Sequence, residues 1–104
     1  MQFSGTPCYL APEVFQKKPF DEKVDVFSFG ALLWELFSKE IPFDGLEPTQ
    51  IMEHIMNGDL AHKHNIPKQI MEIVRVCRKF NSDERPSFEG IESLLEKVQI
   101  DKIK

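Results

Sequence analysis

The longest hydrophobic segment of the chain runs from Val24 to Phe37, with the sequence VDVFSFGALLWELF. Ten of its fourteen residues are apolar and lie on every side of a helical wheel, while Ser28 and Glu35 fall on one narrow side. A helix that is apolar on all sides is buried on all sides. Fourteen residues are too few to span a bilayer as a helix. The pattern therefore predicts a buried helix around which the rest of the domain packs.

Four further segments carry helical signals. Residues 11–16 begin with Ala-Pro-Glu, and a proline followed by an acid favours a helix start. Residues 48–57, residues 67–80 and a segment from near Ser87 to Val98 repeat apolar residues at helical spacing, and Ser87 suits an N-cap. We expect these helices to turn a common set of residues inward: Ile51, Met52, Ile55, Met56, Ile70, Ile73, Val74, Cys77, Phe88, Ile91, Leu94, Leu95 and Val98.

The segments between these helices predict loops rather than strands. Proline, glycine and polar residues gather there, and no run of residues alternates at the period of two that a half-buried strand requires. The sequence also contains no internal repeat and no linker-like run. These observations predict a single all-α domain of about five helices over residues 1–104.

Composition and charge indicate the cellular compartment of this domain and the classes of partner that it does not bind. The formal charge is -4, with 17 acidic and 13 basic residues, and the absence of a basic face argues against a nucleic-acid partner. No apolar run follows Met1, so no signal peptide is predicted, and no segment suits a membrane span. Cys8 and Cys77 lack CxxC spacing and fit reduced thiols. We therefore predict a cytoplasmic protein that binds neither nucleic acid nor membrane.

The candidate metal ligands are His62 and His64. Their spacing is compatible with two ligands of one ion, but no third ligand lies near them in the sequence. Zinc sites use three or four protein ligands. A solvated loop explains these histidines better, and no metal site is predicted.

Four short motifs then occur in a fixed order and at matched intervals. They are GTPCYLAPEVF at 5–15, DVFSFGALLWELF at 25–37, PF at 42–43 and ERPSF at 84–88. Together they resemble the second half of the C-terminal lobe of a protein kinase. The resemblance runs from the loop that receives the substrate's next residue to the last helix of the lobe. It implies that residues 1–104 form the helical part of an incomplete kinase domain.

The motifs also indicate a subgroup. Thr6 in the pattern GT-x-x-Y-x-APE is similar to serine/threonine kinases, whereas SFG-x-LLWELF and RPSF resemble tyrosine kinases and their serine/threonine relatives. The combination resembles the tyrosine-kinase-like group. Phe27 and Arg78 stand where the family pattern has tryptophan, and Ser82 replaces a common proline. These departures indicate a divergent member.

The resemblance implies roles for particular residues. Glu13 would pair with Arg85, and Asp25 would accept backbone N–H bonds from the catalytic loop. Thr6 would hydrogen-bond the catalytic aspartate and its neighbouring lysine. Without the resemblance, Glu13 and Asp25 are also explained as acids favoured by a helix N-terminus, and Thr6 as a loop threonine. The implied substrate-pocket loop consists of Gly5, Thr6, Pro7, Cys8, Tyr9 and Leu10.

The chemistry of phosphoryl transfer requires elements that the sequence does not contain. Kinases use a Gly-rich loop, a paired lysine and glutamate, a catalytic aspartate, and Asn and Asp ligands for Mg²⁺. The five glycines never form GxG, and no HRD occurs. We predict no catalytic residue and no bound cofactor in this chain, since ATP and Mg²⁺ belong to the complete domain of the family. The chain is expected to be an inactive fragment of a protein serine/threonine kinase.

The alternative hypothesis is a kinase remnant that catalyses nothing and binds partners through helix 48–57. Under either hypothesis the expected partner is a protein, either a substrate or a docking protein. In the family, a preceding helix and the catalytic loop cover one side of the helix at 24–37. The sequence lacks both, so this side is expected to be exposed and open to self-association.

Overall fold

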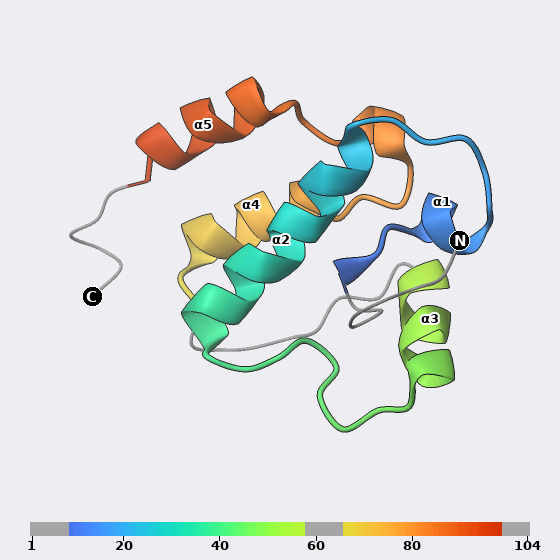
Figure 1. The fold of residues 1–104 in the computed structure, drawn as a ribbon. Helices are drawn as coiled ribbons and strands as arrows, with labels where there is room; N and C mark the ends of the chain where they lie inside the picture. The colour runs from blue at the N-terminus through green and yellow to red at the C-terminus, as the bar shows by residue number, and fades with distance from the viewer. Residues whose placement is uncertain (1–8, 58–65, 99–104) are drawn as a thin grey trace.

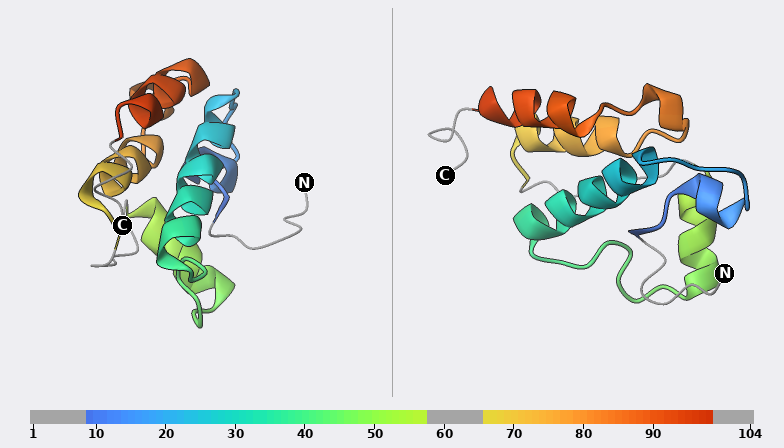
Figure 2. Two further views of the ribbon diagram at one scale, coloured as in Figure 1. Left: turned by 90° about the vertical axis from the view of Figure 1, so that its left-hand side faces the viewer. Right: turned by 45° about the horizontal axis from the view of Figure 1, so that its top comes forward.

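The computed structural model describes residues 9–57 and 66–98. Within these ranges the chain is helical and contains no strand, which confirms the predicted all-α class with five α-helices. The helix α2 lies in the centre, α4 and α5 pack on one side of it, and α1 and α3 lie together on the other (Figures 1 and 2). The elements are α1 (Pro12–Phe15), α2 (Lys23–Ser38), α3 (Pro48–Met56), α4 (Lys68–Cys77), the 3-10 turn η2 (Ser82–Glu84) and α5 (Phe88–Glu96).

The buried residues form two clusters that share α2. The first cluster joins α2, α4 and α5, and the second joins α1, α2 and α3. The first contains Val26, Leu33, Trp34, Ile66, Ile70, Met71, Ile73, Val74, Cys77 and Ile91. The second contains Ala11, Val14, Phe27, Ile51 and Ile55.

The prediction that the central helix is buried on every side is wrong for one side. Leu32 is 53% exposed and Leu36 is 70% exposed. They line an open hollow together with Ile41, which follows the helix and is 48% exposed. No described helix covers this side, because α4 and the α1–α3 pair occupy the others. The described part of α2 therefore leaves one apolar side uncovered.

The inward set predicted for the last helix also needs correction. Phe88 is 46% exposed and Leu95 is 37% exposed, whereas Ile91 is buried. The helix α5 packs mainly on α4, and Phe88 also contacts the ring of Phe29 in α2 edge-on, with ring centres 6.1 Å apart. Only part of the surface of α5 is therefore covered. Leu94 and Val98 complete that part as half-buried residues.

The left-handed residue Lys39 ends α2. Its φ is 62°, and its backbone N–H donates to the carbonyl of Glu35 at 2.8 Å. The next backbone N–H, of Glu40, donates to the hydroxyl of Ser38 at 3.1 Å. The first of these bonds satisfies one of the last four carbonyls, which a helix end can leave unpaired. The chain then turns toward α3.

The two helices α2 and α4 approach each other at Gly30. A Cβ atom built there would lie 2.8 Å from Cγ of Arg78 and 2.9 Å from Cβ of Cys77. Forcing a methyl group into a packed contact destabilises a protein by roughly 1–3 kcal/mol. We therefore expect Gly30→Ala to lower the free energy of unfolding by about that amount, measured by urea denaturation.

Gly90 provides the matched control for this substitution. It lies in the first turn of α5, where its N–H donates to the predicted N-cap hydroxyl of Ser87 at 3.1 Å. A Cβ atom at this position would lie 3.4 Å from Cβ of Pro86, an ordinary contact. Because alanine favours a helix over glycine by up to about 1 kcal/mol, Gly90→Ala should stabilise the chain. Equal effects of the two substitutions would contradict the close approach at Gly30.

Candidate functional site

An ion pair joins the first helix to the loop before the last one. Glu13 in α1 is 9% exposed, and Arg85, which follows η2, is 2% exposed. The guanidinium donates from Nη1 to Oε2 of Glu13 at 2.7 Å and from Nη2 to Oε1 at 2.8 Å. This bidentate arrangement is the strong form of an arginine–carboxylate pair. The structure thus brings together the two residues that the resemblance paired.

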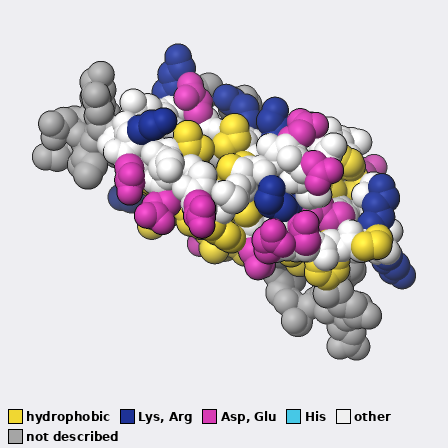
Figure 3. Space-filling view, turned by 90° about the horizontal axis from the view of Figure 1, so that it is seen from above, with side chains coloured by type: hydrophobic (Ala, Val, Ile, Leu, Met, Phe, Trp, Pro, Cys, Tyr) yellow, Lys and Arg dark blue, Asp and Glu magenta, His cyan; other side chains and the backbone are white. Residues whose placement is uncertain are grey.

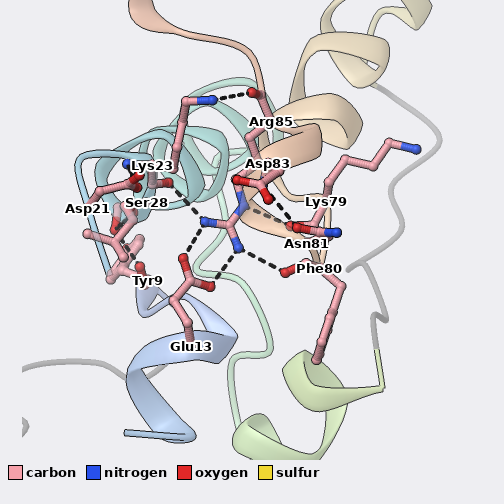
Figure 4. Close-up of polar contacts among 11 residues, drawn as sticks. Tyr9, Glu13, Asp21, Lys23, Ser28, Lys79, Phe80, Asn81, Asp83 and Arg85 are labelled. Atoms are coloured by element: carbon pink, nitrogen blue, oxygen red, sulfur yellow. Dashed lines mark hydrogen bonds and ion pairs between the residues drawn. The ribbon is translucent and has the colours of Figure 1, made fainter. Parts of the chain in front are cut away.

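The remaining donors of Arg85 bind backbone carbonyls of two other segments. Nη1 donates to the carbonyl of Lys23 at 3.0 Å, Nε to that of Lys79 at 2.8 Å, and Nη2 to that of Phe80 at 3.1 Å. All five N–H groups of the guanidinium are therefore used. In return, Nζ of Lys23 donates to the carbonyl of Arg85 at 2.7 Å. Arg85 thus connects α1, the start of α2 and the loop that follows α4 (Figure 4).

This environment lowers the pKa of Glu13. Burial acts to raise the pKa of the carboxyl, but the hydrogen bonds and charge of Arg85, together with the backbone N–H of Glu13, bring it below the ordinary value of 4.5. The carboxylate is therefore held in its charged form. The folded chain binds a proton at Glu13 less readily than the unfolded chain does.

This difference predicts a pH dependence of stability. A lowered folded pKa stabilises the fold fully above the unfolded value near 4.5, and the contribution is lost as the pH falls through the folded pKa. We expect the free energy of unfolding to decrease below that pH more steeply in the natural chain than in Glu13→Gln, which cannot ionise there. Urea denaturation at a series of pH values measures both slopes. If the free energy of unfolding falls equally steeply with decreasing pH in both chains, Glu13 does not contribute to the pH dependence of stability.

The segment that leads into α1 is attached to α2 through Tyr9. The hydroxyl of Ser28 donates to the backbone carbonyl of Tyr9 at 2.5 Å, and the Tyr9 hydroxyl donates to the carboxylate of Glu35. Ser28 and Glu35 are the residues that interrupt the apolar surface of α2 on one narrow side. Leu10 packs half-buried against the second cluster. The polar side of the central helix therefore holds the start of the described chain in place.

The other predicted site residues that the structure describes contribute no hydrogen bond to this ion pair. Asp25 is exposed in the first turn of α2, where an acid is favoured by the helix N-terminus. Its implied contact with a catalytic loop stays a prediction. The remaining residues of the implied substrate-pocket loop lie outside the described residues: Gly5, Thr6, Pro7 and Cys8.

The described residues hold no alternative chemical centre. Across 9–57 and 66–98, no group of three or more His, Cys, Asp and Glu side chains is placed to bind a metal ion. His62 and His64 lie outside these ranges. Burial raises the pKa of Cys77 to about 12, so its thiol stays protonated and unreactive. No helix in this part of the chain is long and apolar enough to cross a membrane.

Sequence reasoning missed the carbonyl partners of Arg85 and the bond between Tyr9 and Glu35. Every residue carries a backbone carbonyl, so nothing in the identity of Lys79 or Phe80 marks it as an acceptor. The position of Glu35 on the polar side of α2, seven residues after Ser28, was the one available signal.

Comparison with known proteins agrees with this arrangement. A family model described as protein tyrosine and serine/threonine kinase matches residues 3–95. A probable serine/threonine-protein kinase of Dictyostelium discoideum is 41% identical over 91 residues, which cover 86% of this chain. The dual specificity protein kinase shkA of the same organism is 38% identical over 93% of the chain. The serine/threonine-protein kinase VIK of Arabidopsis thaliana is 35% identical over 92% of it.

The chain corresponds to a small part of each of these relatives. The matched region spans 7%, 19% and 22% of their respective lengths. The family match nevertheless extends over nearly all of the 104 residues. The chain therefore belongs to the protein tyrosine and serine/threonine kinase family.

Proposed function

We propose that this chain is the substrate-side, helical half of the C-terminal lobe of a protein serine/threonine kinase in the tyrosine-kinase-like group. The complete domain transfers the γ-phosphate of ATP to serine or threonine of a protein substrate in the cytoplasm. In this proposal residues 5–10 form the substrate pocket, and Asp25 anchors the catalytic loop. The chain itself contributes positioning and no catalytic group.

The observation that carries this proposal is the attachment of the segment at 9–15 to the rest of the lobe. The bidentate pair between Glu13 and Arg85 fixes its end, and Ser28 and Glu35 fix Tyr9. A substrate-binding loop must be held in one geometry to align the reacting groups. The names of the relatives support the choice of substrate, since two of the three are serine/threonine kinases and the third is a dual specificity kinase.

The residues of this chain do not fit a site for ATP and Mg²⁺. The glycines are isolated from one another in the sequence, and the described acids and histidines form no cluster of metal ligands. We therefore expect no saturable binding when the 104-residue chain is titrated with Mg-ATP in a calorimeter, and no phosphate transfer. Saturable binding at micromolar ATP would contradict this expectation.

Nothing specific favours the rival role of helix 48–57 as a partner-binding element. Ile51 and Ile55 of α3 are buried in the second cluster, and Met52 and Met56 are half-buried. The helix thus directs its apolar face inward, against α1.

On the face of the molecule seen from above, acidic, basic and hydrophobic side chains are interspersed without a basic stripe (Figure 3).

A chimeric kinase tests the proposed function. The matching segment of VIK would be replaced by this chain, and phosphorylation of serine, threonine and tyrosine peptides measured. We expect an active chimera that phosphorylates serine or threonine. Glu13→Ala in the chimera should reduce the activity strongly, because the segment at 9–15 loses its attachment.

Glu92→Ala is the control, because Glu92 is exposed on α5 and is not among the hydrogen-bond partners of Arg85. It should leave the activity of the chimera unchanged. A folded chimera that is inactive, or one that phosphorylates tyrosine alone, would contradict the proposal.

A further inference from the structure

Arg78 connects the two buried clusters of the chain. It follows the last residue of α4, and 7% of its surface is exposed. Although α4 belongs to the first cluster, the guanidinium of Arg78 reaches the second. Its central carbon lies 4.6 Å from the ring centre of Phe27 and 6.0 Å from that of Phe43. One side chain therefore spans both cores.

The stem of Arg78 is fixed by the central helix. A Cβ atom built at Gly30 would lie 2.8 Å from Cγ of Arg78. The stem of Arg78 therefore contacts α2 at Gly30, a residue that has no side chain. Arginine readily buries its methylene groups along apolar surface, and its weakly hydrated guanidinium stacks on aromatic rings. Stem and head are thus held by two neighbouring positions of α2, Gly30 and Phe27.

Phe27 contacts a second guanidinium, that of the ion pair. Its ring centre lies 5.1 Å from the central carbon of Arg85, and the ring is 2% exposed. Cations within about 6 Å of a ring centre are attracted to the ring, most strongly where water is excluded. A continuous series of contacts therefore leads from Arg78 through Phe27 to Arg85 and Glu13.

We propose that Arg78 is a positioning residue for α1, because it fixes the Phe27 ring beside Arg85 and so helps to hold Arg85 against Glu13. The two positions in contact are also two of the three at which the chain departs from the kinase pattern. The inference concerns contacts within the chain and holds independently of the proposed activity.

Hydrogen exchange of backbone amides in the 104-residue chain tests this role. After the end of α1, the N–H of Gln16 donates to the carbonyl of Pro12, and the N–H of Lys18 donates to that of Glu13. Both bonds thus report on whether α1 is held in place. Arg78→Met keeps an unbranched apolar stem and removes the guanidinium. We expect both amides to exchange about fivefold faster in this variant, as loss of one ring–guanidinium contact implies. The amide of Ile91 in α5 should keep its natural rate.

Further variants separate positioning from a general loss of stability. Phe27→Leu should accelerate the same two amides at least as much, because it removes the contacts of the ring with both Arg78 and Arg85. Adding Arg78→Met to Phe27→Leu should change the two rates little further, because the ring contact of Arg78 is already lost. Arg75→Met removes an exposed arginine one turn earlier on α4 and should change neither rate.

Two results would overturn the proposal. Equal acceleration of all amides in Arg78→Met would show that Arg78 contributes only to global stability. Unchanged rates at Gln16 and Lys18 would show that it does not position α1. If Arg78→Met fails to fold, Arg78→Gln provides the same comparison, since it keeps a polar group at the end of the side chain and removes the cation.

Discussion

Glu13→Ala and Arg85→Ala are each expected to lower the free energy of unfolding by roughly 3–5 kcal/mol, because each leaves a buried charge without its partner. Arg85 is the more deeply buried of the two, at 2% exposure against 9%. Its removal also eliminates the hydrogen bonds to the carbonyls of Lys23, Lys79 and Phe80. Arg85→Ala should therefore be at least as destabilising as Glu13→Ala.

The double variant identifies the interaction. If the two residues act as one pair, Glu13→Ala combined with Arg85→Ala should lose clearly less stability than the sum of the single variants. Urea denaturation followed by circular dichroism measures all three. Glu84→Ala, which removes an exposed acid next to Arg85, is the control and should change stability by no more than about 0.5 kcal/mol. Additive effects of the single variants would mean that the two side chains do not interact.

The second large effect is expected at the uncovered side of α2. Leu32, Leu36 and Ile41 leave apolar surface in water, and each such side chain forgoes up to about 1.5–3 kcal/mol of burial. Two or three of them amount to much of the roughly 5–15 kcal/mol by which domains are stable. These three side chains line one hollow, which Glu35, Lys39 and Glu40 also border, and exposed apolar side chains gathered in this way promote association. We therefore expect the 104-residue chain to be helical and loosely packed, to self-associate, and to bind a dye for exposed apolar surface.

Polar residues at this patch should reverse the association. Leu32→Gln with Leu36→Glu should lower the sedimentation coefficient toward that of a monomer and reduce dye fluorescence, while helicity is kept. Leu33→Gln is the matched control on the same helix, because Leu33 is 7% exposed and its replacement buries an amide at the expense of packing. It should destabilise the fold and leave association unrelieved. A sharp, cooperative, high-temperature melt of a strictly monomeric natural chain would contradict the prediction.

Local signals allowed the helices to be predicted from the sequence. The apolar period, the proline at the start of α1 and the serine before α5 act within a few residues of one another, so they are visible without a fold. The structure shows a helix at each predicted segment, with ends that differ by at most three residues. The ordered motifs were also enough to identify the kinase family, and the family model that matches residues 3–95 confirms that identification.

The same local signals did not determine which residues of a helix are covered. Leu32 and Leu36 are as apolar as Leu33, and Leu95 is as apolar as Leu94. Exposure depends on which neighbouring helix lies against each side, and this is a property of the assembled fold. Periodicity therefore predicted too much burial on α2 and α5.

The sequence by itself determined the helical elements, the kinase family and the pairing of Glu13 with Arg85, the last only through the resemblance. The tertiary structure decided what surrounds that pair. Glu13 and Arg85 are 72 positions apart, and Lys23 lies 62 positions from Arg85. Contacts across such separations form only when helices pack, and the carbonyl acceptors carry no side-chain signature. The reach of Arg78 across Gly30 to Phe27 depends on the same packing, since it requires α2 and α4 to meet at a residue without a side chain.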